Sequence, residues 1–358
     1  MSGNEKALDK FRKGCVIPAV PLALDSGRRW DKLRQRAIIR YYLSAGAGGL
    51  AVAVHTTQFK IREAGLFEPL LSLVMDEVKS FCALTGNAIM CIAGACGPVP
   101  QALKEARTAK KLGYHAVLLS PGGLSEYSEA ELVERSRKVA ELLDVIGFYL
   151  QSAVGGRDFT YEYWRDLCAV PGVIGIKSAP FNRYQTLDLV RAAALSDRSE
   201  EISLYTGNDD NIILDLLTTY CFLHEGRIYK KGFVGGLLGH WAVWVKNAVN
   251  QLESIHKMKE RKEISAEILT LAQQVTDCNG AFFDVNNKFK GCIAGVHEVL
   301  RRQGLLEGIW CLDPSEKLSP GQSEEIDRVY EMYPGLNDDE FVSKHLKTWL
   351  QQEGFYVE

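Results

Sequence analysis

Residues 15–258 alternate short apolar runs with longer segments in which apolar residues recur every three or four positions. The short runs are rich in Val, Ile, Leu or Ala and are bounded by Gly, Pro or Ser, which is typical of strands buried on both faces. The predicted strands are 15–24, 49–54, 88–95, 115–120, 145–150, 172–177, 202–207 and 231–236. The predicted helices are 31–45, 63–84, 99–112, 128–143, 160–169, 186–196, 209–223 and 241–258.

The spacing of these runs predicts the fold. The strands begin about every 30 residues, which is the size of a βαβ unit. Eight strands alternating with eight helices predict an α/β protein with a (β/α)8 TIM barrel of about 250 residues. A doubly wound open sheet is the alternative, but it would have fewer strands and a glycine-rich loop after the first one. Here the first strand leads instead into Asp25-Ser26-Gly27-Arg28-Arg29.

The last hundred residues have a different pattern. Residues 259–358 contain charged, amphipathic segments of helical period, with apolar positions such as Leu271, Val275, Val296 and Val299. Such faces would form a large apolar patch if left bare, so we expect them to cover the barrel or a partner subunit. The predicted organisation is a barrel with the active site in residues 1–258 and a C-terminal helical region in 259–358.

Composition narrows the class of protein. Of the 358 residues, 46% are hydrophobic and 24% are charged, as in a soluble globular chain with a large core. The net charge of −3 comes from mixed acids and bases, which argues against binding to nucleic acid or an anionic membrane. No apolar run reaches the roughly 20 residues of a membrane span. The first residues lack the apolar core of a signal peptide, and we expect a cytoplasmic protein.

The nine cysteines contain no C-x-x-C pair and no zinc-type spacing. They are therefore expected to be buried, reduced thiols. His55 and His240 follow two of the predicted strands and could act as acid or base, but two lone histidines make a weak metal site. We expect neither a metal ion nor another cofactor.

Candidate chemistry lies at the carboxyl ends of the strands, where TIM barrels carry their active sites. Lys177 ends the sixth run, where burial would lower its pKa and favour nucleophilic attack on a ketone. The alternative is a lysine that points into solvent or pairs with a carboxylate. Tyr149, near the end of the fifth run, could relay protons or could simply be a half-buried strand aromatic.

Other strand ends offer groups for binding an anion. Thr56 and Thr57, next to His55, could present hydroxyls and backbone amides to a carboxylate, or could form a plain turn. Gly235 and Gly236 could bring backbone amides to an anion or form a tight turn.

Together these residues resemble the dihydrodipicolinate synthase / N-acetylneuraminate lyase family of Schiff-base aldolases. The matching segments occur in order along the chain. They are Ile17-Pro18-Ala19-Val20-Pro21-Leu22, the stretch from Gly46 to His55-Thr56-Thr57, Ala93-Gly94, Ser120-Pro121, Phe148-Tyr149, Gly175-Ile176-Lys177 and Tyr205-Thr206-Gly207-Asn208-Asp209. Each segment is weak alone, but their order and the 28-position spacing from Tyr149 to Lys177 make the resemblance strong.

The resemblance implies metal-free chemistry on a small 2-oxo acid such as pyruvate, by a lyase of the aldolase or dehydratase type. Lys177 would be the Schiff-base lysine, Tyr149 and Thr56 would relay protons, and Thr57 would help Thr56 to hold the carboxylate. His55 and Gly207, in the matching segments, would line the substrate site. A homo-oligomer, either a tetramer or a dimer, is also implied.

Several positions depart from the family pattern. His55 replaces a glycine, and Gly122 and Gly123 stand where many members carry tyrosines, one of which completes the proton relay. Val154 falls where the lysine-pathway synthase has an arginine for its second substrate, and Arg157 is nearby but out of register. A non-catalytic member that binds a small carboxylate as a sensor or structural subunit is therefore the alternative function.

Overall fold

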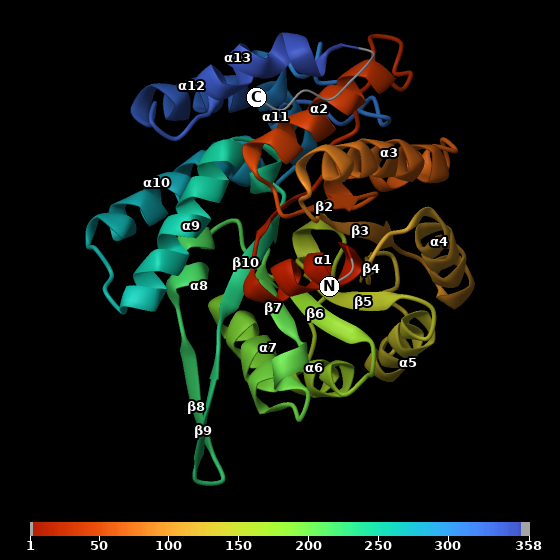
Figure 1. The fold of residues 1–358 in the computed structure, drawn as a ribbon, viewed down its shortest axis with the longest axis vertical. Helices are drawn as coiled ribbons and strands as arrows, with labels where there is room; N and C mark the ends of the chain where they lie inside the picture. Colours follow the sequence, from red (N-terminus) through yellow and green to blue (C-terminus); the bar gives the residue numbers. More distant parts are fainter. Residues whose placement is uncertain (1–2, 352–358) are drawn as a thin grey trace.

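The structure is a computed structural model that describes residues 3–351. Within these residues, eight parallel strands form one sheet with the neighbour order β1-β10-β7-β6-β5-β4-β3-β2. The sheet curls back on itself, because Ala19 beyond β1 bridges Ala51 of β2 and the Val20 amide donates to the Ala51 carbonyl at 2.9 Å. The predicted (β/α)8 barrel is therefore confirmed (Figure 1).

The predicted strands are present, with shifts of a few residues at their ends. The barrel strands are β1 (Val16–Pro18), β2 (Gly49–Val52), β3 (Met90–Ala95), β4 (Ala116–Leu119), β5 (Asp144–Leu150), β6 (Val173–Ala179), β7 (Ser203–Thr206) and β10 (Phe233–Leu238). The helices around them are α2 (Lys32–Ala45), α3 (Phe67–Thr85), α4 (Val99–Leu112), α5 (Glu129–Ala140), α6 (Tyr161–Cys168), α7 (Arg183–Leu195), α8 (Ile212–Leu217) and α9 (Val245–Arg261).

Two elements differ from the expectation. An N-terminal helix, α1 (Gly3–Lys13), precedes the barrel, and its Phe11 stacks on Tyr205 at a centroid distance of 4.6 Å. The helix predicted over 209–223 ends early, at Leu217, and a hairpin of β8 (Tyr220–His224) and β9 (Arg227–Lys231) follows it. The hairpin projects away from the barrel in Figure 1, with the side chains of Leu223 and Ile228 exposed.

Two apolar layers hold the barrel together. Inward residues such as Ile17, Met90 and Ile146 fill its interior, whereas alternate residues pack outward against the surrounding helices. Because each strand is buried on both faces, inward and outward positions are both apolar.

The C-terminal residues form helices that pack against the barrel. They are α10 (Glu267–Phe282), α11 (Cys292–Arg302), α12 (Gln322–Met332) and α13 (Asp339–Trp349), shown in blue tones in Figure 1. The buried Arg40 of α2 binds Glu77 and donates to the backbone carbonyl of Trp349 at 2.9 Å. One continuous core joins the outer layer of the barrel to these helices. The expected division after residue 258 falls in the last turn of α9.

Candidate active site

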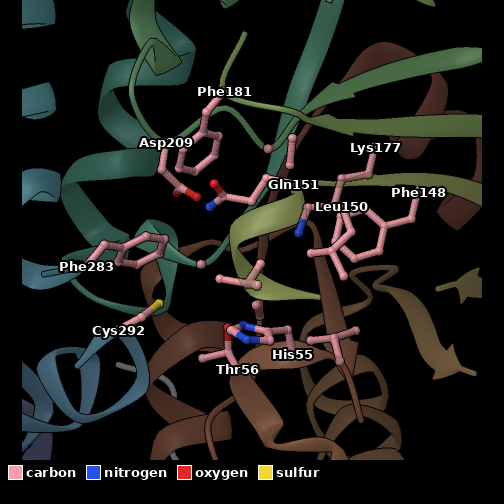
Figure 2. Close-up of a pocket in the computed structure, with 16 residues that line it drawn as sticks. His55, Thr56, Phe148, Leu150, Gln151, Lys177, Phe181, Asp209, Phe283 and Cys292 are labelled. Carbon is pink, nitrogen blue, oxygen red and sulfur yellow. The ribbon is translucent and has the colours of Figure 1, made fainter. Parts of the chain in front are cut away.

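A small cavity of about 50 Å³ lies at the carboxyl ends of the barrel strands (Figure 2). Its walls come from the ends of β1, β2, β5, β6, β7 and β10, and from the C-terminal helical region. The lining residues are Ala19, Val54, His55, Thr56, Phe148, Leu150, Gln151, Val154, Lys177, Ala179, Phe181, Gly207, Asp209, Gly239, Phe283 and Cys292. The cavity is therefore at the place where the sequence analysis expected the active site.

Lys177 of β6 points from the barrel wall into this cavity. Its ammonium nitrogen lies 4.4 Å from the centre of the Phe148 ring. Within residues 3–351, the side chain makes no hydrogen bond or ion pair. Burial lowers its pKa from the ordinary value to about 8, against the opposing effect of the Asp209 carboxylate. More of this amine is therefore neutral near pH 7 than in an exposed lysine.

Gly207, directly after β7, provides the space for the lysine. A Cβ at this position would lie 2.6 Å from the Lys177 Cε and 2.9 Å from the Ala179 Cβ. Any side chain there would displace the lysine or the strand that carries it. The predicted place of Gly207 in the site is therefore explained by close packing rather than by contact through its amide.

Asp209 is the one carboxylic acid among the cavity-lining residues of the described chain. Its side chain is buried, and one oxygen, Oδ1, accepts a hydrogen bond from the backbone amide of His240 at 3.0 Å. Burial raises its pKa to about 7, although the His240 amide and Lys177 act in the opposite direction. The carboxyl group is thus poised between its two protonation states near neutral pH.

A buried network fixes the loop that carries Asp209. The Asn208 Oδ1 accepts from the backbone amide of Phe181 at 3.1 Å, and its Nδ2 donates to Asp215 at 2.9 Å. The same Asp215 oxygen accepts from the Thr206 hydroxyl at 2.7 Å. These bonds join the loops after β6 and β7, so Asp209 is held on a rigid support.

The residues after β2 divide between the cavity and the protein core. Thr56 lines the cavity, and within residues 3–351 its hydroxyl makes no hydrogen bond. Thr57 does not line it, because its hydroxyl donates to the backbone carbonyl of Val20 at 2.6 Å. His55 lines the cavity, where burial and the nearby Lys177 lower its pKa to about 4. His55 is therefore a neutral imidazole at pH 7.

Tyr149 lies on the other side of the barrel wall. Its neighbours in β5, Phe148 and Leu150, line the cavity, whereas Tyr149 packs outward against Trp164 of α6 and against Phe159. Its hydroxyl accepts a hydrogen bond from the Phe159 amide at 3.3 Å. The structure does not bring Tyr149 together with Lys177, because successive side chains of a strand point to opposite faces. A proton relay through Tyr149 does not fit this geometry.

The two glycines of β10 also lie away from the cavity. A Cβ at Gly235 would meet the backbone of Cys15 at 2.5 Å, and one at Gly236 would meet the Trp241 ring at 2.5 Å. Both are therefore sites of close packing. Gly239, just beyond the strand, lines the cavity instead. The expected contribution of Gly235 and Gly236 thus comes from a glycine three to four residues later, because β10 extends to Leu238.

Several cavity residues were not among the predicted site residues. Gln151 follows β5 and presents its side-chain amide to the cavity (Figure 2). Phe283 and Cys292 come from the C-terminal helical region, which therefore contributes walls to the site. Asp209 ends one of the segments that resemble the family, and this position could have identified it as a candidate site residue. Nothing in the sequence pattern alone connects Phe283 or Cys292 with the barrel.

The positions that depart from the family pattern also divide between the cavity and the rest of the protein. Val154, in a short 3₁₀ helix (Ser152–Val154), lines the cavity as an apolar group. The Arg157 guanidinium is used elsewhere, since it donates to the backbone carbonyl of Tyr127 at 2.5 Å and lies over the Phe159 ring. Neither Gly122 nor Gly123 lines the cavity. Among the described residues, the cavity wall after β5 therefore has no cationic side chain.

The described residues contain no group of three or more His, Cys, Asp and Glu side chains arranged to hold a metal ion. In the same part of the chain, no helix has the length and apolarity needed to cross a membrane.

Related proteins of known sequence include dehydratases. The chain is 28% identical over 135 residues to a probable 5-dehydro-4-deoxyglucarate dehydratase of Acinetobacter baumannii, covering 37% of this chain and 42% of the relative. It is 26% identical over 200 residues to probable 5-dehydro-4-deoxyglucarate dehydratase 2 of Streptomyces coelicolor, covering 54% of this chain and 58% of the relative. The chain thus spans about half the length of these relatives.

Solved structures share the fold over most of the chain. The dihydrodipicolinate synthase from Oceanobacillus iheyensis has a TM-score of 0.70 at 18% identity, covering 93% of this chain and 100% of that one. The N-acetylneuraminate lyase from Fusobacterium nucleatum has a TM-score of 0.70 at 15% identity, covering 90% and 99%. The sequence pattern of the dihydrodipicolinate synthetase family matches residues 12–219, which is more than half of the chain. The protein therefore belongs to the dihydrodipicolinate synthetase family.

Proposed function

We propose that this protein is a lyase that forms a Schiff base between Lys177 and a small 2-oxo acid such as pyruvate. The observation that carries the proposal is the position of the Lys177 amine, which is buried, unpaired within residues 3–351 and directed into the cavity. Its lowered pKa supplies the neutral form that attacks a ketone. Membership of a family that includes lyases and dehydratases supports the same reaction class.

The covalent step follows from this geometry. The lone pair of the Lys177 nitrogen attacks the keto carbon, and the carbonyl π electrons move to the oxygen. Protonation of that oxygen and loss of water then leave an iminium ion, which withdraws electrons from the adjacent carbon. Among the cavity-lining residues of the described chain, Thr56 has the one hydroxyl group, which can donate a hydrogen bond to the carboxylate of the 2-oxo acid. The neutral His55 can donate a second hydrogen bond to the same carboxylate. Thr57 supports this turn through its bond to Val20.

Trapping with borohydride tests the proposal. Incubation with pyruvate and borohydride should leave one reduced pyruvyl group on Lys177, located by mass spectrometry of peptides. Lys177→Met should abolish the label. Lys231→Met is the matched control, because burial also lowers the pKa of Lys231 but its amine donates to the Ser199 carbonyl instead of facing the cavity. A label on another lysine, or no label with any 2-oxo acid tested, would contradict the proposal.

The dehydratase names of the two relatives favour elimination of water from a sugar-derived 2-oxo acid over aldol cleavage. Turnover of a panel of hydroxylated 2-oxo acids would separate the two reactions, since aldol cleavage releases pyruvate and dehydration does not. The absence of Tyr149 from the cavity favours one further candidate, a protein that binds the acid without turning it over. Adduct formation without turnover of any panel member would establish that candidate. A homo-oligomer, tetramer or dimer, remains a prediction for solution measurement.

A further inference from the structure

The proposed function leaves one chemical task unassigned. After the iminium ion has formed on Lys177, a nearby group must remove a proton from the carbon next to it and later return one. Tyr149 packs outside the barrel wall and cannot reach this carbon in the present arrangement. The residue that transfers this proton is assigned here on the basis of the proposed function.

Besides Lys177, three titratable side chains line the cavity of the described chain, namely Asp209, His55 and Cys292. Figure 2 shows the Asp209 carboxylate directed into the same space as the Gln151 amide. The His240 amide binds only Oδ1 of Asp209, and no hydrogen bond within residues 3–351 uses Oδ2. The carboxyl group is thus fixed at one oxygen and available at the other.

We propose that Asp209 is the catalytic base and acid that moves the proton at the carbon adjacent to the Lys177 imine. The Asp209 carboxylate accepts the proton, and the C–H electron pair forms a carbon–carbon double bond. The π electrons of the C=N⁺ bond move to nitrogen, which yields a neutral enamine and a neutral carboxylic acid. While it is on Asp209 the proton exchanges with water. In the reverse step Asp209 returns a proton to the carbon, and the iminium ion is restored.

The surroundings of Asp209 suit a proton carrier. Burial holds its pKa near neutrality, and the acidic neighbour Asp210 acts in the same direction, while Lys177 and the His240 amide act against them. The buried Cys292 thiol also faces it, but the pKa of this thiol is raised by burial and it stays protonated. His55 has a pKa lowered to about 4, which makes it a weaker base than a carboxylate titrating near pH 7. The His240 ring is buried with a similarly lowered pKa.

Exchange of the pyruvate methyl protons with deuterium, followed by NMR in D2O, tests this assignment. Asp209→Asn keeps an oxygen that can accept from the His240 amide but removes the base. Exchange should fall about 10²–10⁴-fold, the usual range for a positioned acid or base. The Lys177 adduct should still form under borohydride, since removing the carboxylate lowers the lysine pKa further. Asp209→Glu should restore part of the exchange.

The pH profile adds a second readout. In the unmodified protein, exchange should rise with pH as Asp209 loses its proton, because only the carboxylate form is a base. The Asn variant should lack this rise. The profile is measured at saturating pyruvate, so that titration of the free Lys177 amine does not contribute to the rise. Loss of the iminium proton at higher pH would lower the exchange rate rather than raise it.

Two control variants separate the alternatives. Asp210→Asn removes the adjacent carboxyl, which does not line the cavity and acts on Asp209 by raising its pKa. This variant should keep the maximal exchange rate of the unmodified protein, with the rise displaced to lower pH. If Asp209→Asn forms the adduct and exchanges at the unmodified rate, Asp209 is not the base; loss of exchange in His55→Asn alone would assign the role to His55 and likewise overturn the proposal. If the unmodified protein forms no adduct, the proposed function fails, and this inference fails with it.

Discussion

Strands β5 and β6 are neighbours in the barrel, and they use their two faces differently. Their register pairs Phe148 with Lys177 and Tyr149 with Ser178. The first pair points into the barrel, where the lysine lies over the phenylalanine ring. The second pair faces the helices, where Tyr149 packs against α6. A shift of one residue along a strand therefore decides whether a side chain meets the cavity or the helical layer.

The substitution with the largest predicted loss lies beside Lys177. Gly207→Ala would place a methyl group 2.6 Å from the Lys177 Cε, so the amine must move. A misplacement of about 1 Å can cost about 10²-fold in rate, and we expect a loss of this size in the rate of pyruvate adduct formation, measured by quenched borohydride trapping.

Gly280→Ala is the matched control for this substitution. A Cβ at Gly280, inside α10, would meet no atom within 4 Å. Alanine is also favoured over glycine in a helix by about 1 kcal/mol. The control should therefore form the adduct at the unmodified rate. Equal rates in both variants would show that Gly207 does not hold the lysine in place.

A second prediction concerns the apolar wall that follows β5. Val154 offers no charge to a second carboxylate, and Arg157 is bound to a backbone carbonyl elsewhere. A missing charge-assisted hydrogen bond is worth about 1.5–3 kcal/mol, or roughly 10–150-fold in affinity. Aspartate semialdehyde should therefore be a poorer partner for pyruvate than an aldehyde of similar length without the second carboxylate. A higher kcat/KM for the semialdehyde would show that a cationic group reaches this wall.

The smallest predicted change concerns Tyr149 of β5 and affects stability rather than turnover. Tyr149→Phe removes a hydroxyl that accepts a hydrogen bond from the Phe159 amide, and keeps the ring that packs against α6. Loss of this buried bond should lower the free energy of unfolding by about 1 kcal/mol, as measured by urea denaturation. The rate of turnover should not change. A drop of about 10²-fold or more in turnover would instead place the Tyr149 hydroxyl at the reacting atoms.

Much of the barrel was predictable because its strands are short, apolar and evenly spaced. Which side chains of each strand point into the barrel and which point toward the helices was not predictable from the same pattern. In β5, Phe148, Tyr149 and Leu150 are all large and apolar, so no alternation distinguishes the inward face. Lys177 could be placed because a single charged residue in a buried strand must point toward water or a cavity.

The remaining differences also have physical causes. The hairpin was missed because apolar residues over 209–223 also fit a helical period, whereas Glu225 and Gly226, both at positive φ, form the tight turn. Phe283 and Cys292 reach the cavity only through the packing of the C-terminal helices. Long-range packing of this kind leaves no local signal in a single sequence.

A crystal structure of the protein trapped with pyruvate and borohydride would show which residue carries the adduct and which side chain lies beside its methyl carbon. We expect a reduced pyruvyl group on the Lys177 nitrogen, with its methyl carbon facing the Asp209 carboxylate and Tyr149 still packed against Trp164. A pyruvyl group on any other residue, or a rearranged β5 that brings the Tyr149 hydroxyl to the adduct in place of Asp209, would contradict this prediction.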